Sequence, residues 1–122
     1  MDNRELLERL WAAEGELTLS AEAEHEMRTE DYVLEMPQSG ERIVGRDKMR
    51  AMQQEYPSPP SITILRITGE GDHFVVLGRS DYSGDIYYVA NVVEFRDGRI
   101  ARETRIYGAP FDPPEWRLKY AD

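Results

Sequence analysis

Residues 61–107 read SITILRITGE GDHFVVLGRS DYSGDIYYVA NVVEFRDGRI ARETRIY, a run in which β-branched and alternating apolar residues prevail throughout. Three Gly-containing breaks interrupt it, at Gly69-Glu70-Gly71-Asp72, Ser83-Gly84-Asp85 and Arg96-Asp97-Gly98. Short breaks of this composition between alternating segments are typical of β-hairpins. We therefore predict a meander of four antiparallel strands, at about 61–68, 73–82, 86–95 and 99–107.

The residues before this run show helical periodicity instead. Apolar side chains recur three or four apart behind a possible cap at Asp2 or Asn3, and Ser20 can cap a second helix. A short strand is predicted at 32–36, and a third helix begins near Gly45 and stops at the proline-rich residues 57–60. Helices followed by strands, rather than alternating with them, indicate an α+β domain.

Length, charge and composition exclude several classes of protein. A chain of 122 residues suits one domain, 1–122, with a core of its own. Its net charge of -9 argues against a nucleic-acid partner, because such proteins concentrate Lys and Arg. The absence of Cys excludes disulfides and thiolate chemistry and fits a reducing compartment. No segment reads as a signal peptide or a membrane span, so we predict a cytoplasmic protein without membrane contact.

Two short motifs carry a family resemblance. Val33-Leu34-Glu35-Met36-Pro37 is followed by Gly45-Arg46-Asp47, and residues 92–100 read VVEFRDGRI. With the order of the elements, over residues 3–108, these motifs resemble the nuclear transport factor 2-like superfamily, and within it the SnoaL-like branch. The resemblance implies a cone-shaped, strongly curved, mostly antiparallel sheet packed by three N-terminal helices around an apolar pocket.

That superfamily includes ketosteroid isomerases, limonene epoxide hydrolase, polyketide cyclases and pure binding domains, so the fold alone selects no function. The resemblance places the isomerases' proton-shuttling Asp at Met36, their oxyanion-side Asp at Asn91 and their helix-one Tyr near Trp11. Met36 cannot act as a base, so we reject steroid isomerisation by that mechanism. The amide of Asn91 can still donate a hydrogen bond to a developing oxyanion.

The last predicted strand carries the strongest candidate pair. In the superfamily register Glu103 and Arg105 point into the cone, and a buried carboxylate beside a guanidinium is a group whose pKa is often tuned. Strand alternation sends further side chains inward. These are Tyr87, Val89, Asn91 and Val93 before the last turn, and Tyr107 after it. The competing interpretations are an ordinary ion pair on the sheet surface and, for Asn91, a satisfied core amide.

Two functions of different class follow. The first is small-molecule binding, with Asn91, Glu103 and Arg105 orienting a ligand in a mostly apolar pocket. The second is an enzyme of hydrolase, cyclase or isomerase type, in which Glu103 acts as acid or base, Arg105 sets its pKa and Asn91 polarises a carbonyl or epoxide. We favour binding, because the first strand lacks the Asp. The predicted lining is Trp11, Met27, Met36, Met49, Tyr87, Val89, Val93 and Tyr107.

Four smaller predictions complete the sequence analysis. Apolar Ala90 and Val92 on the convex face predict a homodimer through that face. His25, between two Glu on a helix, is predicted to face solvent, and His73 to lie in an exposed turn. Because neither His has ligating neighbours in the sequence, no metal or cofactor is predicted. The proline-rich residues 108–122 are predicted to form an ordered tail laid over the body.

Overall fold

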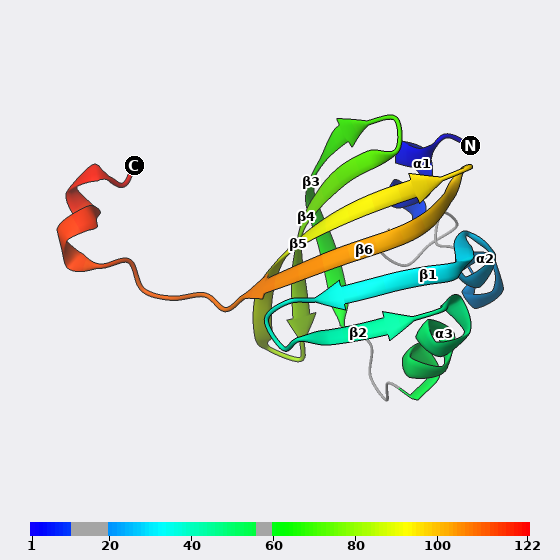
Figure 1. Ribbon diagram of the computed structural model, residues 1–122. Helices are drawn as coiled ribbons and strands as arrows, with labels where there is room; N and C mark the ends of the chain where they lie inside the picture. Colours follow the sequence, from blue (N-terminus) through cyan, green and yellow to red (C-terminus); the bar gives the residue numbers. More distant parts are fainter. Residues whose placement is uncertain (11–19, 56–59) are drawn as a thin grey trace.

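A computed structural model describes residues 1–10, 20–55 and 60–122, and Figure 1 shows a curved sheet with helices at one end. The strand order is β2-β1-β6-β5-β4-β3, and every pairing is antiparallel except that of β1 with β6. The helices are α1 (Asn3–Leu10), α2 (Ala21–Glu26), α3 (Arg46–Glu55) and the 3₁₀ helix η1 (Glu115–Tyr120). The strands are β1 (Arg28–Met36), β2 (Glu41–Val44), β3 (Ser61–Glu70), β4 (His73–Tyr82), β5 (Asp85–Arg96) and β6 (Arg99–Gly108).

The α+β class and the four-stranded meander are confirmed. The strands β3 to β6 begin and end within two residues of the predicted bounds. The turn between β5 and β6 shows why the hairpin prediction works: Asp97 and Gly98 have φ values of 54° and 79°, as a two-residue turn of type I′ requires. Such a turn matches the right-handed twist of the strands that it joins.

The first strand region differs from the prediction. β1 starts at Arg28, four residues before the predicted start, and β2 was not predicted at all. The chain turns at Gly40, where φ is 76°, and β2 pairs with β1 from Met36↔Glu41 to Val33↔Val44. β2 is only four residues long, mostly exposed, and lies at the edge of the sheet. A short, half-polar edge strand has too weak an alternation to be detected from sequence.

The helices follow their predicted signals where the structure describes them. The side chain of Ser20 accepts a hydrogen bond from the Ala23 amide at 3.1 Å and so caps α2. α3 begins directly after Gly45 and lies against β1 and β2. α1 is tied to the β3–β4 turn, because Asn3 Nδ2 donates to the Gly71 carbonyl at 2.9 Å. The later part of the predicted first helix lies outside the described residues, as does the proline-rich segment at 57–59.

The main core lies between α1 and the inner, concave face of the sheet. Leu6, Leu7 and Leu10 of α1 are buried, and the inner-face rings of Phe74 and Phe95 meet edge to face at 5.9 Å. The buried cluster is completed by apolar residues from the remaining elements: Met27, Tyr32, Leu34, Met49, Ile67, Val76, Val93 and Ile100. The end of the inner face that lies against α1 is therefore filled by apolar side chains.

The C-terminal residues depart from the prediction. Figure 1 shows them leaving β6 and running away from the sheet instead of lying over the body. None of the six residues of η1 is buried. The expectation of a tail laid over the domain is therefore wrong for the structure of this single chain, although the tail does contain the ordered helix η1.

Candidate functional site

The inward orientation predicted for β5 and β6 is confirmed for Asn91, Val93 and Glu103, whereas Tyr87 near the start of β5 is exposed. Asn91 pairs with Arg105, and Val93 pairs with Glu103, so these four side chains share the inner face. Asn91 and Val93 are buried, and Glu103 is fully buried, with 0% of its surface exposed. The alternative of a surface ion pair is thereby excluded for Glu103, because strand alternation turns it toward the core.

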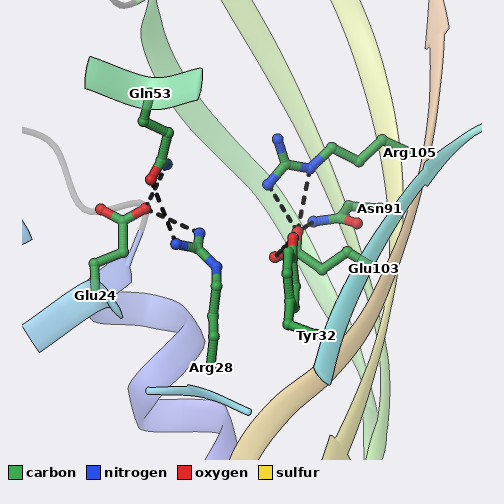
Figure 2. Close-up of polar contacts among 7 residues, drawn as sticks. All are labelled: Glu24, Arg28, Tyr32, Gln53, Asn91, Glu103 and Arg105. Atoms are coloured by element: carbon green, nitrogen blue, oxygen red, sulfur yellow. Dashed lines mark hydrogen bonds and ion pairs between the residues drawn. The ribbon is translucent and has the colours of Figure 1, made fainter. Parts of the chain in front are cut away.

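The carboxylate of Glu103 is the centre of a hydrogen-bonded cluster, which Figure 2 shows and which we call the Glu103 cluster: Tyr32, Asn91, Glu103 and Arg105. Oε1 accepts from the Tyr32 hydroxyl at 2.9 Å. Oε2 accepts from Asn91 Nδ2 at 2.6 Å and from Nε and Nη2 of Arg105 at 3.1 and 2.8 Å. Four donors on one carboxylate compensate the loss of water that burial imposes.

Tyr32 is the member of the cluster that the sequence analysis missed. It lies on β1, and its partner Glu103 is 71 residues away in the sequence. β1 and β6 pair in parallel, with Leu34 opposite Glu103, which brings the Tyr32 hydroxyl to the carboxylate. The available signal was alternation with Leu34 and Met36, which would have placed Tyr32 on the inner face.

Electrostatics hold this carboxylate in its charged form. Burial raises the pKa of Glu103, but the charges of Arg105 and Arg28 and the hydrogen bonds from Asn91 and Arg105 outweigh it, and the net shift is downward. Burial and the neighbouring carboxylate raise the pKa of Tyr32, so its hydroxyl keeps its proton and remains a donor. The cluster is therefore an ionised carboxylate surrounded by fixed donors.

The amide of Asn91 is used differently from the prediction. Its Nδ2, expected to donate to a ligand, already donates to Glu103, and its Oδ1 is buried without a hydrogen-bond partner among the described residues. The orientation follows from chemistry, because a carboxylate accepts from the NH₂ group and repels the amide oxygen. The atom left for a ligand is thus an acceptor.

A second polar group, also missed, adjoins the Glu103 cluster. Arg28 is almost fully buried, and its guanidinium lies 5.1 Å from the centroid of the Tyr32 ring. Its Nη2 donates to Glu24 at 2.9 Å, and Gln53 donates to the same Glu24 oxygen at 2.7 Å. Figure 2 shows this group beside the Glu103 cluster, with the Arg28 guanidinium turned toward Glu24 and Gln53. Arg28 therefore contributes a second positive charge beside Glu103.

The predicted exposure is wrong for one histidine and confirmed for the other. His25 was predicted to face solvent and is instead buried, with Nε2 3.4 Å from Asp47 Oδ1. The cause is tertiary, because α3 lies against α2 and covers that side of the short helix. His73 is exposed, as predicted, though it opens β4. The described residues contain no group of three or more His, Asp or Glu side chains placed to hold a metal ion.

The predicted apolar lining divides into two parts. Met27, Met49 and Val93 are buried in the core cluster. The remaining described residues of the lining are less buried and lie toward the end of the inner face opposite α1: Met36, Tyr87, Val89 and Tyr107. Trp11 lies outside the described residues. Met36 and not Glu35 belongs to the inner face, since Met36 packs against the core and Glu35 meets Arg102 outside.

The inner face of the sheet combines the fixed, charged Glu103 cluster with one end, away from α1, that other side chains cover only in part. Arg105 is 17% exposed, so its guanidinium marks the boundary between the buried Glu103 and the partly covered inner-face residues. A carboxylate that already accepts four hydrogen bonds is a rigid anchor for its neighbours. Two buried polar atoms of this region have no hydrogen-bond partner among the described residues, Arg28 Nε and Asn91 Oδ1, and of these the Asn91 oxygen is the acceptor.

Comparisons with known proteins agree with this architecture. The family model described as a SnoaL-like domain matches residues 4–103. An NTF-2 like protein of unknown function from Burkholderia xenovorans is 34% identical, with a TM-score of 0.84 over 98% of this chain and 92% of that chain. A comparison with curated proteins finds no match.

Two further solved structures are more distant. A putative ketosteroid isomerase from Kribbella flavida is 26% identical, with a TM-score of 0.76 over 84% of this chain and 76% of that chain. A hypothetical protein with a ketosteroid isomerase-like fold from Catenulispora acidiphila, solved with trimethylamine, is 14% identical, with a TM-score of 0.63 over 86% and 85% of the two chains. The last likeness concerns the fold alone.

Proposed function

Because this chain belongs to the SnoaL-like domain family, we propose that it binds a small organic molecule against the inner face of its sheet. The ligand has an apolar body and one hydrogen-bond donor, such as a hydroxyl or amide N–H. The body meets Met36, Val89 and Tyr107 at the partly covered end. The donor reaches Asn91 Oδ1, and the Glu103 cluster holds that amide in place.

The observation that carries this proposal is the buried, unpartnered Oδ1 of Asn91. A buried acceptor without a partner costs free energy, so a ligand that supplies a donor gains a hydrogen bond and removes that cost. Nδ2 donates to Glu103, which prevents the amide from turning round and presenting its NH₂ group to a ligand acceptor. The site should therefore prefer donors over pure acceptors at this position.

The direct test uses pairs of compounds that share one apolar skeleton and differ by a single hydroxyl, titrated by calorimetry. The hydroxylated member should bind roughly 2- to 10-fold more tightly, the value of one net hydrogen bond. Asn91→Ala should abolish the preference, whereas Arg102→Ala, on the outer face of the same sheet, should keep it. Equal affinity of both members for the wild-type chain would refute the proposal.

An enzyme that uses Glu103 as acid or base remains the second function from the sequence analysis, and the geometry supports it less. General acid–base catalysis needs a pKa near the working pH and a group free to reach the substrate. The pKa of Glu103 is lowered, and its two oxygens already accept four hydrogen bonds. Turnover of an epoxide or polyketide-like substrate that is lost in Glu103→Gln would reverse this choice.

We also propose a cytoplasmic homodimer that pairs through the outer, convex face of the sheet. Val92 and Ile106 are exposed there, on adjacent strands, while Ala90 is partly buried. Exposed apolar side chains on neighbouring strands favour an isologous contact. No helix in the described residues is long and apolar enough to cross a membrane. Sedimentation that shows a monomer at micromolar concentration would contradict the dimer.

A further inference from the structure

The C-terminal arm, residues 109–122, carries the largest exposed apolar side chains in the described structure. The exposed fractions of four of them lie between 51% and 78%. They are Phe111, Trp116, Leu118 and Tyr120. Figure 1 shows the arm extending away from every strand and ending far from the sheet. Monomeric proteins seldom expose so many large apolar groups together, so this arm requires a surface to cover it.

The conformation of the arm also calls for a partner. A six-residue 3₁₀ helix without a buried residue has little intrinsic stability, because short helices owe their order to packing. Within the arm the described side-chain contacts are local: Arg117 lies 5.9 Å from the Trp116 ring and Lys119 lies 5.1 Å from the Tyr120 ring. Contacts of this kind do not hold a segment away from its own domain.

The arm leaves the sheet on its convex side. Its first residues form a shallow hollow together with Tyr88, a residue of the outer face. The outer face then continues with exposed apolar side chains on three adjacent strands: Val75 on β4, Val92 on β5 and Ile106 on β6. We call Val75, Tyr88, Val92 and Ile106 the outer patch. The arm and the outer patch are thus two exposed apolar surfaces of one chain, which meet only where Phe111 lies beside Tyr88.

A solved relative contains the same segment. The match to the Burkholderia protein covers 98% of this chain, which leaves almost no residue of the arm without a counterpart. The match to the family model, by contrast, covers residues 4–103 and does not reach the arm. The arm is therefore a feature that this chain shares with a particular relative, beyond the common domain.

We propose that the arm is exchanged with a second copy of this chain, where it lies on the outer patch. One chain carries both the apolar arm and the apolar patch, so a twofold pair covers both at once and closes the assembly. Residues 109–114 can span up to ~20 Å, enough to reach a neighbour. Each arm has three aromatic side chains, and each such side chain buries ~150–250 Å². Two arms would therefore bury on the order of 1,000 Å² of their own surface, and the partner's surface adds to this. Stable interfaces bury about 1,200–2,000 Å² in total.

The test is the dimer dissociation constant from sedimentation equilibrium. Three variants are compared with the full chain: a chain that ends at Gly108, Trp116→Ala, and Asp112→Ala as the matched polar control in the arm. Loss of the arm should weaken the dimer by at least about tenfold, and Trp116→Ala should weaken it severalfold, as truncation of a buried aromatic anchor does. Asp112→Ala should have the wild-type constant. A native-like circular dichroism spectrum with a cooperative thermal transition would show that the truncated domain still folds.

Hydrogen exchange of the wild-type arm at low and high protein concentration supplies a measurement that needs no variant. Protection of residues 115–120 that rises with the dimer fraction supports exchange between copies. Protection at concentrations where the chain is monomeric would mean that the arm folds back on its own domain, and would overturn the proposal. So would a monomer at all concentrations, or a dimer that keeps its dissociation constant without the arm.

Discussion

Arg102 and Glu103 are consecutive residues on β6, and each forms an ion pair, but the two pairs lie on opposite faces of the sheet. Glu103 and Arg105 meet at 2.8 Å on the inner face, with 0% and 17% of their side chains exposed. Arg102 and Glu35 meet at 3.3 Å on the outer face, with 46% and 30% exposed. The charged groups are the same, but the inner pair is buried and its carboxylate accepts two further hydrogen bonds, from Tyr32 and Asn91.

This difference determines how much each pair matters. An ion pair on the surface adds little to the stability of the fold, because water screens both charges and the two side chains lose conformational freedom when they pair. A buried pair costs several kcal/mol per ion in lost hydration, and its partners persist only because they compensate one another. Removal of one buried partner should therefore be much more damaging than removal of its surface equivalent.

The largest effect is expected for Arg105→Ala. It removes two of the four donors to Glu103 and leaves a buried carboxylate without its nearest positive charge. We expect the free energy of unfolding to fall by ~3–5 kcal/mol in urea titrations. The double variant Glu103→Gln with Arg105→Met should recover much of this loss, because no uncompensated charge remains. A change below ~0.5 kcal/mol for the single variant would mean that the pair is effectively solvated.

A smaller loss is expected for Tyr32→Phe. The hydroxyl is the donor to Glu103 Oε1, and its removal leaves that buried oxygen unsatisfied while the ring and its packing remain. The expected loss of unfolding free energy is ~1–3 kcal/mol. Tyr88→Phe on the exposed outer face is the matched control, with an expected change within ~0.5 kcal/mol. Equal effects of the two variants would place the Tyr32 hydroxyl in contact with water.

Acid unfolding gives a third comparison. The folded pKa of Glu103 lies below the ordinary value of 4.5, so its contribution to stability is present above that value and is lost as pH falls through the lowered pKa. One such group contributes a slope of at most ~1.4 kcal/mol per pH unit within that window. The free energy of unfolding, measured by heat or urea from neutral to acid pH, should fall less steeply with decreasing pH for Glu103→Gln than for the wild-type chain. An equal dependence of the unfolding free energy on pH in the two proteins would contradict the lowered pKa.

The smallest effect is expected on the outer face. Arg102→Ala breaks the contact with Glu35 and a longer one with Glu94 at 4.0 Å. The unfolding free energy should change by ~0.2–1 kcal/mol, and less in high salt, because screening weakens exposed pairs. If Arg102→Ala instead destabilises the chain as much as Arg105→Ala, burial is not the property that separates the two faces.

The amino-acid sequence alone determined the α+β class and the four-stranded meander, and together with the family resemblance it predicted the inward direction of Asn91, Glu103 and Arg105. The reason is physical: strand alternation has a period of two, and the Asp97-Gly98 turn sets the register of β5 and β6, so burial of any one residue decides the face of the others. These properties depend on residues that are close together along the chain.

Only the tertiary structure decided which residues from distant parts of the chain contact one another. Tyr32 reaches Glu103 across 71 residues through a parallel pairing that no local pattern encodes. His25 is buried because α3 covers it, and the short β2 exists because an edge of β1 is available. The arm was predicted to lie on its own domain, but its apolar side chains remain exposed in the single chain. Hydrophobic residues signal that a segment needs cover, but the sequence does not say which surface provides it, because contacts between distant segments depend on the complete fold.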